Sequence, residues 1–401
     1  MNGAGWLMTI VRRFLVAVLL GSASAAFAAR APALAGVVFD DRNGNGARDA
    51  GEPGIAGARI SDQVRTVESG PDGSWTIAER GGFGLVAINP PAGYAVNGAF
   101  FKRAGGGPVD FALVHAATPS AFTFIHASDC HVSPQTVERL TLLRDLASAE
   151  RPAFVLLTGD LVRDALRVSE AEARSYYDLY VREIAQFRVP VYAVPGNHEN
   201  FGIERDRSHV SVDHPLYGKQ MYRTLVGPNY YSFDFGGIHF VGLDTADISD
   251  QWYYGHVDAA QLAWLAGDLA HVTSTTPVVT FNHIPFVTAV DVMAGYTESP
   301  PAPTLIEIDG RKQYRHVVSN RADVFALLKG HPFPLALGGH MHTREVLRYE
   351  AEGVAARFEQ AAAVVGPNEV GPLRMRSGVT VYDVRDGSIS DGRFIALDRD
   401  K

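Results

Sequence analysis

The chain has 401 residues, of which 46% are hydrophobic and 20% are charged, a balance typical of folded globular proteins. At about 150 residues per domain, this length predicts two or three domains and excludes a single small module. The formal net charge is -8 and no block of basic residues occurs, so we do not expect binding to a nucleic-acid polymer. The single cysteine, Cys130, excludes an internal disulfide and a thiolate metal cluster, and we interpret it as a small buried apolar residue.

Residues 1–28 have the order of regions found in a secretory signal peptide. The pair Arg12-Arg13 precedes an apolar run from Phe14 to Leu20, and the small-residue sequence Ala26-Phe27-Ala28 follows. The general secretory route is favoured over twin-arginine export, although the arginine pair leaves both open. No later segment reaches the roughly 20 uninterrupted apolar residues of a membrane helix. We therefore expect a periplasmic or secreted protein without a transmembrane anchor after signal removal.

Residues 35–115 carry the pattern of a small antiparallel β-sandwich domain. Short apolar runs alternate there with clusters of glycine, proline, aspartate and asparagine, and no run has helical periodicity. Residues 116–120, which include Pro119, are predicted to form a linker to a second domain. The expected strands are Gly36–Phe39, Ala58–Ser61, Ser74–Ile77, Gly84–Ile88 and Val109–Val114.

Within this region, oxygen-bearing side chains follow the spacing of an EF-hand calcium loop, with Gly46 at the sharp turn. No helix pattern flanks the loop, so we expect it to lie between strands and to hold one structural calcium ion. The alternative is an ordinary surface turn that needs no ion. The candidate calcium ligands are Asp41, Asn43, Asn45, Asp49 and Glu52.

From residue 121 to the end of the chain, buried strands alternate with helices, which predicts an α/β fold. One helix is expected to open at Ser133-Pro134, and Ser169 with Glu172 forms a capping box before another. A third helix covers Gln261–Ala270, and a hairpin around Asp386-Gly387 is predicted to close the domain. The expected strands are Phe122–Ala127, Phe154–Leu157, Val189–Val194, Ile238–Leu243, Val278–Phe281 and Leu335–Leu337.

Five short signals, each of which directly follows a predicted strand, contain side chains that can bind metal ions. Alone, most of them would be ordinary turns or core histidines, but five in succession favour one shared site. Strand ends at one edge of a layered sheet converge, and alternation along an extended chain would point Asp129 and His131 the same way. The signals are Asp129-Cys130-His131, Gly159-Asp160, Gly196-Asn197-His198-Glu199, Asn282-His283 and Gly339-His340-Met341-His342.

The order of these signals resembles the calcineurin-like metallophosphoesterase superfamily, over roughly residues 120–395. The resemblance implies a four-layer α/β/β/α sandwich, preceded here by a β-sandwich domain of the kind attached to some bacterial members. Arg163 stands where purple acid phosphatases carry a tyrosine, which disfavours that subgroup. The implied ligands are Asp129, His131, Asp160 and His342 for one ion, and Asp160, Asn197, His283 and His340 for the other.

Seven nitrogen and oxygen ligands with one shared carboxylate suit two divalent ions of Mn, Zn, Fe or Ni. The sequence therefore predicts a metal-dependent phosphoric ester hydrolase in which a metal-bridging hydroxide attacks phosphorus in line. Asp160 would bridge the ions. His198, oriented by a neighbour such as Asp160 or Glu199, would be the catalytic acid that protonates the leaving group.

The substrate is expected to be an anionic phosphoester, and monoesters and diesters both stay open. Cationic side chains near the metal-binding signals could receive its non-reacting part. The alternative function is a non-catalytic, calcium-stabilised secreted module that binds a phosphate-containing envelope polymer. The oligomeric state is not predicted. The candidate substrate-binding residues are Arg163, Arg311, Arg315 and His316.

Overall fold

The computed structural model describes residues 33–78, 81–299, 303–351, 353–370 and 373–397. The predicted signal peptide, residues 1–28, lies outside these described residues. These described residues all belong to one compact unit. None of the helices in the described part of the chain combines the length and the apolar character needed to cross a membrane.

The region from Leu34 to His115 is all β, as predicted, and contains two four-stranded sheets, β4-β1-β8-β6 and β3-β2-β5-β7. Val38, Trp75 and Phe111 of the first sheet share an apolar cluster with Ile60 and Ile88 of the second. The strands are β1 (Leu34–Asp40), β2 (Arg59–Ser61), β3 (Thr66–Glu68), β4 (Ser74–Ile77), β5 (Leu85–Asn89), β6 (Tyr94–Val96), β7 (Phe101–Arg103) and β8 (Phe111–His115).

The prediction that this region is purely antiparallel is wrong, because β1 and β8 pair in parallel, with Val38 opposite Phe111. These are the first and last strands of the region, so a long connection separates them in the sequence. A parallel pair requires such a connection, since a short hairpin can join only antiparallel strands.

The rest of the chain confirms the predicted α/β fold, with two mixed six-stranded sheets. The first has the order β11-β10-β9-β24-β25, with β26 also paired to β24, and the second has the order β12-β13-β16-β19-β21-β20. The strands are β9 (Ala121–Ala127), β10 (Phe154–Thr158), β11 (Val191–Val194), β12 (Tyr231–Phe235), β13 (Ile238–Leu243), β16 (Val278–Asn282), β19 (Leu335–Gly338), β20 (Glu345–Ala351), β21 (Val354–Gln360), β24 (Gly378–Arg385), β25 (Ser388–Ile389) and β26 (Arg393–Ala396).

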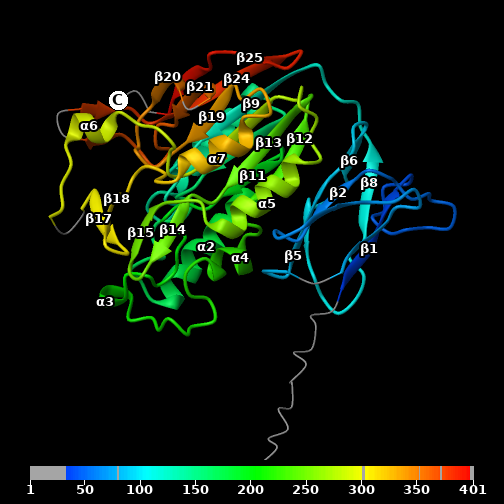
Figure 1. Cartoon of the computed structure of the whole chain (residues 1–401), viewed down its shortest axis with the longest axis horizontal. Helices are drawn as coiled ribbons and strands as arrows, with labels where there is room; N and C mark the ends of the chain where they lie inside the picture. Colours follow the sequence, from blue (N-terminus) through cyan, green and yellow to red (C-terminus); the bar gives the residue numbers. More distant parts are fainter. Residues whose placement is uncertain (1–32, 79–80, 300–302, 352, 371–372, 398–401) are drawn as a thin grey trace, which may run out of the picture. The chain divides into compact units, whose positions relative to one another are not determined.

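Buried apolar clusters show how these sheets and helices are layered. Phe124 and Phe154 of the first sheet pack in one cluster with Phe240 and Phe281 of the second, so the two sheets face each other. Two further clusters join the first sheet to α1 and α2, and the second sheet to α5 and α7. Figure 1 shows α5 and α7 lying over the second sheet. The longer helices are α1 (Val137–Glu150), α2 (Glu170–Ile184), α5 (Ala259–Leu269) and α7 (Arg321–Leu328).

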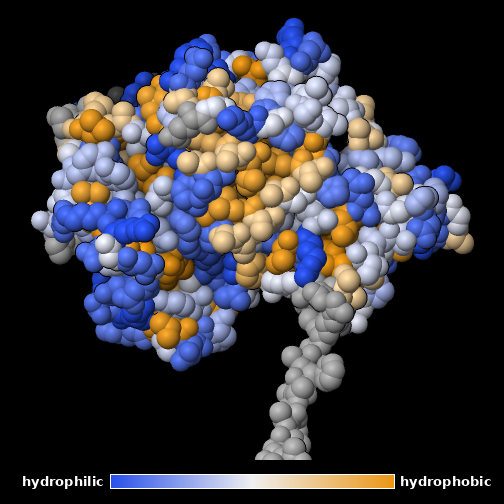
Figure 2. Space-filling view, in the orientation of Figure 1, coloured by the Kyte–Doolittle hydropathy of each residue, from blue (hydrophilic) through white to orange (hydrophobic). Residues whose placement is uncertain are grey.

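Short elements occupy the connections. In the view of Figure 2, apolar residues gather at the centre, where α5 and α7 lie, and hydrophilic residues predominate at the lower left, around α3. The exposed positions of α5 include Ala260, Ala263 and Ala266. The short elements are α3 (Arg205–Ser208), α4 (Gln220–Leu225), α6 (Val290–Ala294), β14 (Ala246–Ser249), β15 (Trp252–Gly255), β17 (Leu305–Ile308), β18 (Arg311–Tyr314), β22 (Asn368–Val370) and β23 (Leu373–Met375).

Helix α2 begins where the capping box predicts, with the Ser169 side chain accepting a hydrogen bond from the Glu172 backbone nitrogen. Helix α1 begins at Val137, so the predicted start at Ser133-Pro134 is wrong. The reason is a turn over residues 133–136, in which Thr136 Oγ1 donates to the His131 carbonyl at 2.7 Å and accepts from the Ser133 nitrogen at 2.9 Å. The turn therefore fixes the backbone of a predicted metal ligand.

Buried polar contacts connect the N-terminal β region to the second sheet. Gln63, which is 1% exposed, donates to Asn229 Oδ1 at 3.1 Å and to the Tyr230 carbonyl at 3.0 Å. Arg59 of β2 forms an ion pair with Asp234 of β12. Because a buried polar group left unpaired is costly, these contacts fix how the N-terminal region packs on the sheet.

Candidate metal centre

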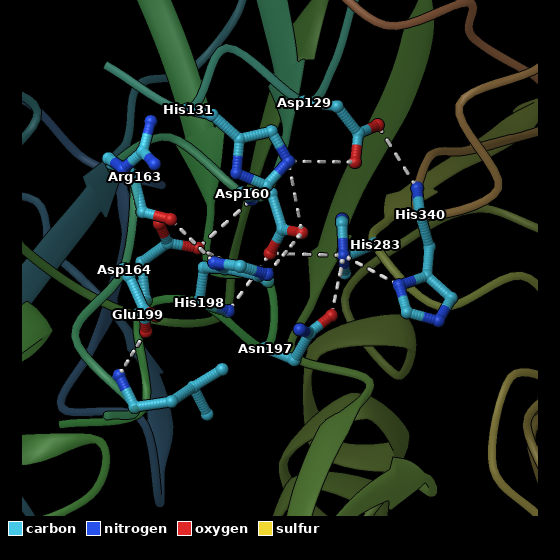
Figure 3. A network of polar contacts seen from close by, with 12 residues as sticks. Asp129, His131, Asp160, Arg163, Asp164, Asn197, His198, Glu199, His283 and His340 are labelled. Atoms are coloured by element: carbon cyan, nitrogen blue, oxygen red, sulfur yellow. Dashed lines mark hydrogen bonds and ion pairs between the residues drawn. The ribbon is translucent and has the colours of Figure 1, made fainter. Parts of the chain in front are cut away.

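All seven predicted metal ligands lie in loops that follow strands at one edge of the two sheets. Strands β9, β10 and β11 are mutually parallel, as are β16 and β19, so within each set the carboxyl ends share an edge. Figure 3 shows six of the seven ligands pointing toward one another, and the seventh, His342, contacts two of them. The ligands are Asp129 and His131 after β9, Asp160 after β10, Asn197 after β11, His283 after β16, and His340 and His342 after β19.

Four of these side chains form a first group. His342 Nε2 lies 3.1 Å from His131 Nε2 and 3.1 Å from Asp129 Oδ1, and His131 Nε2 lies 3.6 Å from Asp160 Oδ2. Asp129 Oδ1 is buried and accepts no hydrogen bond. Two imidazole nitrogens facing each other beside an unsatisfied carboxylate oxygen are stabilised by a shared cation, so this group fits a metal ion.

The second group surrounds His283 Nε2. That nitrogen lies 3.2 Å from Asp160 Oδ1, 3.1 Å from Asn197 Oδ1 and 3.2 Å from His340 Nδ1. The other ring nitrogen of His283 lies 2.7 Å from the Thr158 carbonyl, which can only accept. Nδ1 therefore carries a proton, so Nε2 is the ring nitrogen that can ligate a metal ion.

Asp160 is the residue that the two groups share. Its Oδ2 faces the first group and its Oδ1 faces the second. Among the described residues, the sets of His, Cys, Asp and Glu able to hold a metal ion are these two, both containing Asp160. The residues present therefore fit two adjacent ions, and their nitrogen and oxygen donors suit the predicted Mn, Zn, Fe or Ni.

The backbone at five of the seven ligands is left-handed rather than extended. The φ angles are 55° at Asp129, 42° at His131, 48° at Asp160, 73° at His340 and 52° at His342. Side chains other than glycine adopt this region at a cost, and such residues concentrate at functional sites. The alternation expected of Asp129 and His131 along an extended chain is therefore wrong, although both side chains do reach one site.

Burial and mutual charge set the ionisation of the ligands. Burial would raise the pKa of Asp160, but His283 and His198 hold it well below its usual value. Burial, followed by the charge of His198, lowers the pKa of His131 to about 4. Burial alone would lower the pKa of His283, yet Asp160 raises it to about 9. An anionic Asp160 and a neutral His131 are the forms that bind a cation.

Glu199 has a larger role than the sequence predicted. It is fully buried and accepts hydrogen bonds from the backbone nitrogens of Asp160 at 3.0 Å, Leu161 at 2.8 Å, Val162 at 3.0 Å and Gly196 at 2.6 Å. Burial and the charge of Asp160 raise the pKa of Glu199 to about 8. The side chain thus joins the Asp160 loop to the loop of Asn197, a pairing with no signal in the sequence.

Replacing Glu199 by glutamine is expected to lower the free energy of unfolding by about 3 kcal/mol and to weaken metal binding. The glutamine NH2 group would face backbone donors, and each buried donor left unsatisfied costs about 1–3 kcal/mol. Urea unfolding and metal analysis measure both effects. Glu172→Gln, on the exposed side of α2, is the control and should change stability by less than about 0.5 kcal/mol. If Glu199→Gln and the control had the same free energy of unfolding and the same metal content, Glu199 would not be needed to join the Asp160 and Asn197 loops.

His198 lies beside the metal groups rather than within them. Its Nδ1 is 2.6 Å from the Arg163 carbonyl, and its Nε2 is 3.9 Å from Asp160 Oδ2. The Arg163 carbonyl, which was not among the predicted neighbours, holds the ring through Nδ1. Asp160, one of the predicted neighbours, also holds His198, because its Oδ1 accepts from the His198 backbone nitrogen at 3.0 Å. With Nδ1–H held by a carbonyl, Nε2 is the atom that faces the site.

The four predicted substrate-binding residues lie in different surroundings. The exposed Arg163 follows β10 in the same loop as Asp160. Arg315 is 3% exposed, and its guanidinium lies 4.0 Å from the centre of the Tyr253 ring. The His316 and His340 ring centres are 4.8 Å apart. Arg311, on β18, instead lines a surface cavity of about 390 Å³ to which none of the seven ligands contributes.

The sequence profile of the calcineurin-like phosphoesterases matches residues 122–344, more than half of the chain. The chain therefore belongs to the calcineurin-like phosphoesterase family, and it is a metal-dependent phosphoric ester hydrolase. The matched residues begin after the N-terminal β region and include all seven ligands.

Individual relatives are more distant. The chain is 25% identical over 277 residues to a protein from Rhodococcus erythropolis described as a probable cyclic nucleotide phosphodiesterase, covering 65% of this chain and 79% of that one. A dimetal phosphatase from Danio rerio aligns with 69% of this chain and 99% of its own, with a TM-score of 0.44 and 16% identity. GAP50, described as the anchor in the inner membrane complex of Plasmodium, aligns with 69% of this chain and 85% of its own, with a TM-score of 0.43 and 14% identity.

Proposed function

We propose that this protein is an exported phosphoesterase with two metal ions, which hydrolyses phosphate diesters or monoesters. The position of Asp160 carries the proposal, because its two oxygens face separate ligand groups at 3.6 Å from His131 Nε2 and 3.2 Å from His283 Nε2. Two divalent ions, when bound, neutralise phosphoryl charge and supply a nucleophile from water at neutral pH.

The residues of the chain then hold and move protons around that centre. Asp129 and Asp160 would offset the cationic charge, and the Thr158 carbonyl accepts from Nδ1–H of His283, which leaves Nε2 as the nitrogen on the metal side. His198 Nε2 is free to donate to the departing oxygen, because the Arg163 carbonyl accepts from Nδ1. General acid catalysis from a positioned histidine contributes about 10²–10⁴-fold to the rate.

Phosphodiesters are the first substrates to test, because the relative at 25% identity is described as a probable cyclic nucleotide phosphodiesterase. The purified mature protein should be assayed on a bis-aryl phosphate diester, an aryl monoester and a cyclic nucleotide, with Mn, Zn, Fe and Ni supplied separately. We expect metal-dependent hydrolysis of the diester with at least one of these metals. No hydrolysis of any substrate would instead favour the non-catalytic module that binds an envelope polymer.

Arg163, Arg311 and Arg315 are proposed to receive the non-reacting, anionic part of the substrate. Arg315 supports this best, because its buried guanidinium lies against Tyr253, whose ring centre is 5.8 Å from that of His340. Arg315 has no carboxylate partner among the described residues, and buried charges normally need one. For substrates that carry a second anionic group, we expect Arg315→Gln to raise KM by a larger factor than it lowers kcat. This result would support the contact.

Export is proposed from the signal-peptide pattern of residues 1–28. N-terminal sequencing of the protein recovered from the periplasm or medium should give a chain that starts at Ala29. An intact, cytoplasmic chain that begins at Met1 would contradict export.

The loop from Asp41 to Glu52 is proposed to bind calcium. Asp41 Oδ2 accepts from the Gly46 nitrogen at 2.8 Å and from Asn97 Nδ2 at 2.7 Å, which supports a compact, oxygen-rich loop. An ion bound only to the folded state stabilises it by about 2.7 kcal/mol at a hundredfold excess over Kd. We therefore expect millimolar calcium to raise the melting temperature of the full chain by several degrees. The double variant Asp41→Ala with Glu52→Ala should not show this rise in melting temperature. An unchanged melting temperature of the wild-type chain on adding calcium would contradict the proposal.

A further inference from the structure

His340 presents only one of its two ring nitrogens to the metal groups. Its Nδ1 lies 3.2 Å from His283 Nε2, whereas its Nε2 is buried and has no hydrogen-bond partner. A metal-ligating histidine carries its proton on the other nitrogen and almost always donates it to a carbonyl, carboxylate or water. His283 meets this requirement through the Thr158 carbonyl at 2.7 Å. His340 therefore needs an acceptor that the family's ligand set does not include.

The nearest polar ring to His340 is that of His316. The two ring centres are 4.8 Å apart with the planes at 77°, and His316 Nε2 is also buried without a partner. His316 comes from the segment between β18 and α7. A neighbouring bond, from the Val318 nitrogen to the Pro285 carbonyl at 2.9 Å, holds this segment beside the loop that follows His283.

Asp291 of α6 lies on the other side of His316. Its Oδ1 is 4.0 Å from His316 Nδ1, its Oδ2 is buried without a partner, and the residue is 3% exposed. Three unpartnered buried atoms thus occur in succession on Asp291, His316 and His340. Buried polar atoms of native proteins are normally paired. We therefore expect hydrogen bonds to connect Asp291, His316 and His340 in that order.

We propose that His316 is a positioning residue for the second metal site: its Nε2 accepts from His340 Nε2–H and its Nδ1–H donates to Asp291, each directly or through one water. This arrangement pairs His316 Nε2 with His340 Nε2 and gives the Asp291 carboxylate a donor, so that each hydrogen bond joins one donor and one acceptor. It rests on the proposed function, because it assumes that His340 Nδ1 ligates an ion. It also gives His316 a role other than the direct substrate contact predicted from the sequence.

The expected consequence is a selective loss of affinity at one of the two metal sites. Partners that orient a ligating histidine typically contribute 10–100-fold to metal affinity. His316→Gln should therefore weaken binding of the ion held by Asp160, Asn197, His283 and His340 by that factor. Binding of the ion held by Asp129, His131, Asp160 and His342 should change less than about threefold.

The test is a calorimetric titration of the metal-free full chain with Mn²⁺, which reports binding without activity. Wild type should bind two ions, His316→Gln should bind the second about 10–100-fold more weakly, and Asp291→Asn should show a smaller loss in the same direction. His256→Gln is the matched control, because His256 also pairs with an aspartate, with its Nδ1 2.8 Å from Asp247 Oδ2. It should bind both ions as wild type does.

The outcomes separate this inference from the proposed function. A wild-type chain that binds fewer than two ions contradicts the binuclear function itself. Two ions in wild type with unchanged affinities in His316→Gln overturn the positioning role alone. A raised KM in His316→Gln that excess Mn²⁺ does not restore would show a substrate contact and would also overturn it. If His316→Gln does not fold, unchanged second-site affinity in Asp291→Asn is the overturning result.

Discussion

Asp160→Asn is expected to lower the hydrolysis rate by at least about 10³-fold and to reduce the bound metal to no more than one ion per chain. Asp160 supplies an oxygen to each ligand group, and the asparagine NH2 group in place of one oxygen cannot bind a cation. The variant should lose several kcal/mol of transition-state stabilisation by the metal ions. Each 1.36 kcal/mol added to the activation free energy lowers the rate tenfold, which gives the expected effect. Steady-state kinetics and elemental analysis of the purified variant measure both quantities.

Asp164→Asn is the matched control for this variant. Asp164 lies in the same loop but pairs with Arg167 at 3.2 Å rather than with a metal ligand. It should keep two ions and most of the activity. If Asp160→Asn retained full activity with two ions, the assignment of Asp160 as the shared ligand would be wrong.

His198→Gln is expected to slow alkyl phosphoesters by about 10²–10⁴-fold while leaving nitrophenyl esters within about tenfold of wild type. Alkoxides need a proton to depart, whereas nitrophenolate leaves without one. The ring makes no predicted metal contact, so both ions should stay bound. An equal loss on both substrate types, or a loss of metal, would remove His198 as the acid.

The ligand loops were predictable because each signal is local and follows a buried strand. His283 directly follows β16, and Asp160 follows β10 after a single glycine at φ 85°. The conformation of the ligands was not predictable in the same way, since Asp129 and His131 adopt left-handed φ angles where alternation along a strand was expected. The order of the five metal-binding signals was enough to predict the site, whereas the backbone conformation within each signal was not predictable from strand alternation.

Features that depend on long-range pairing left no signal in the sequence. Gln63 and Asn229 are 166 positions apart and share a buried hydrogen bond. Glu199 accepts from the backbone of Asp160 to Val162, and backbone donors are the same for every residue type except proline. The first helix was misplaced for a local reason, because the Thr136 hydroxyl binds backbone groups that a helix start would otherwise use.

The central claim is that two ions at one shared carboxylate drive phosphoester hydrolysis, and stepwise metal reconstitution tests it most directly. The metal-free chain should receive increasing equivalents of whichever of Mn, Zn, Fe or Ni is most active, while bound metal and the rate on a bis-aryl phosphate are measured together. We predict a negligible rate before the second ion begins to bind and a plateau at two ions per chain. A metal-free chain that is fully active, or a rate that reaches its plateau with one ion, would contradict the account.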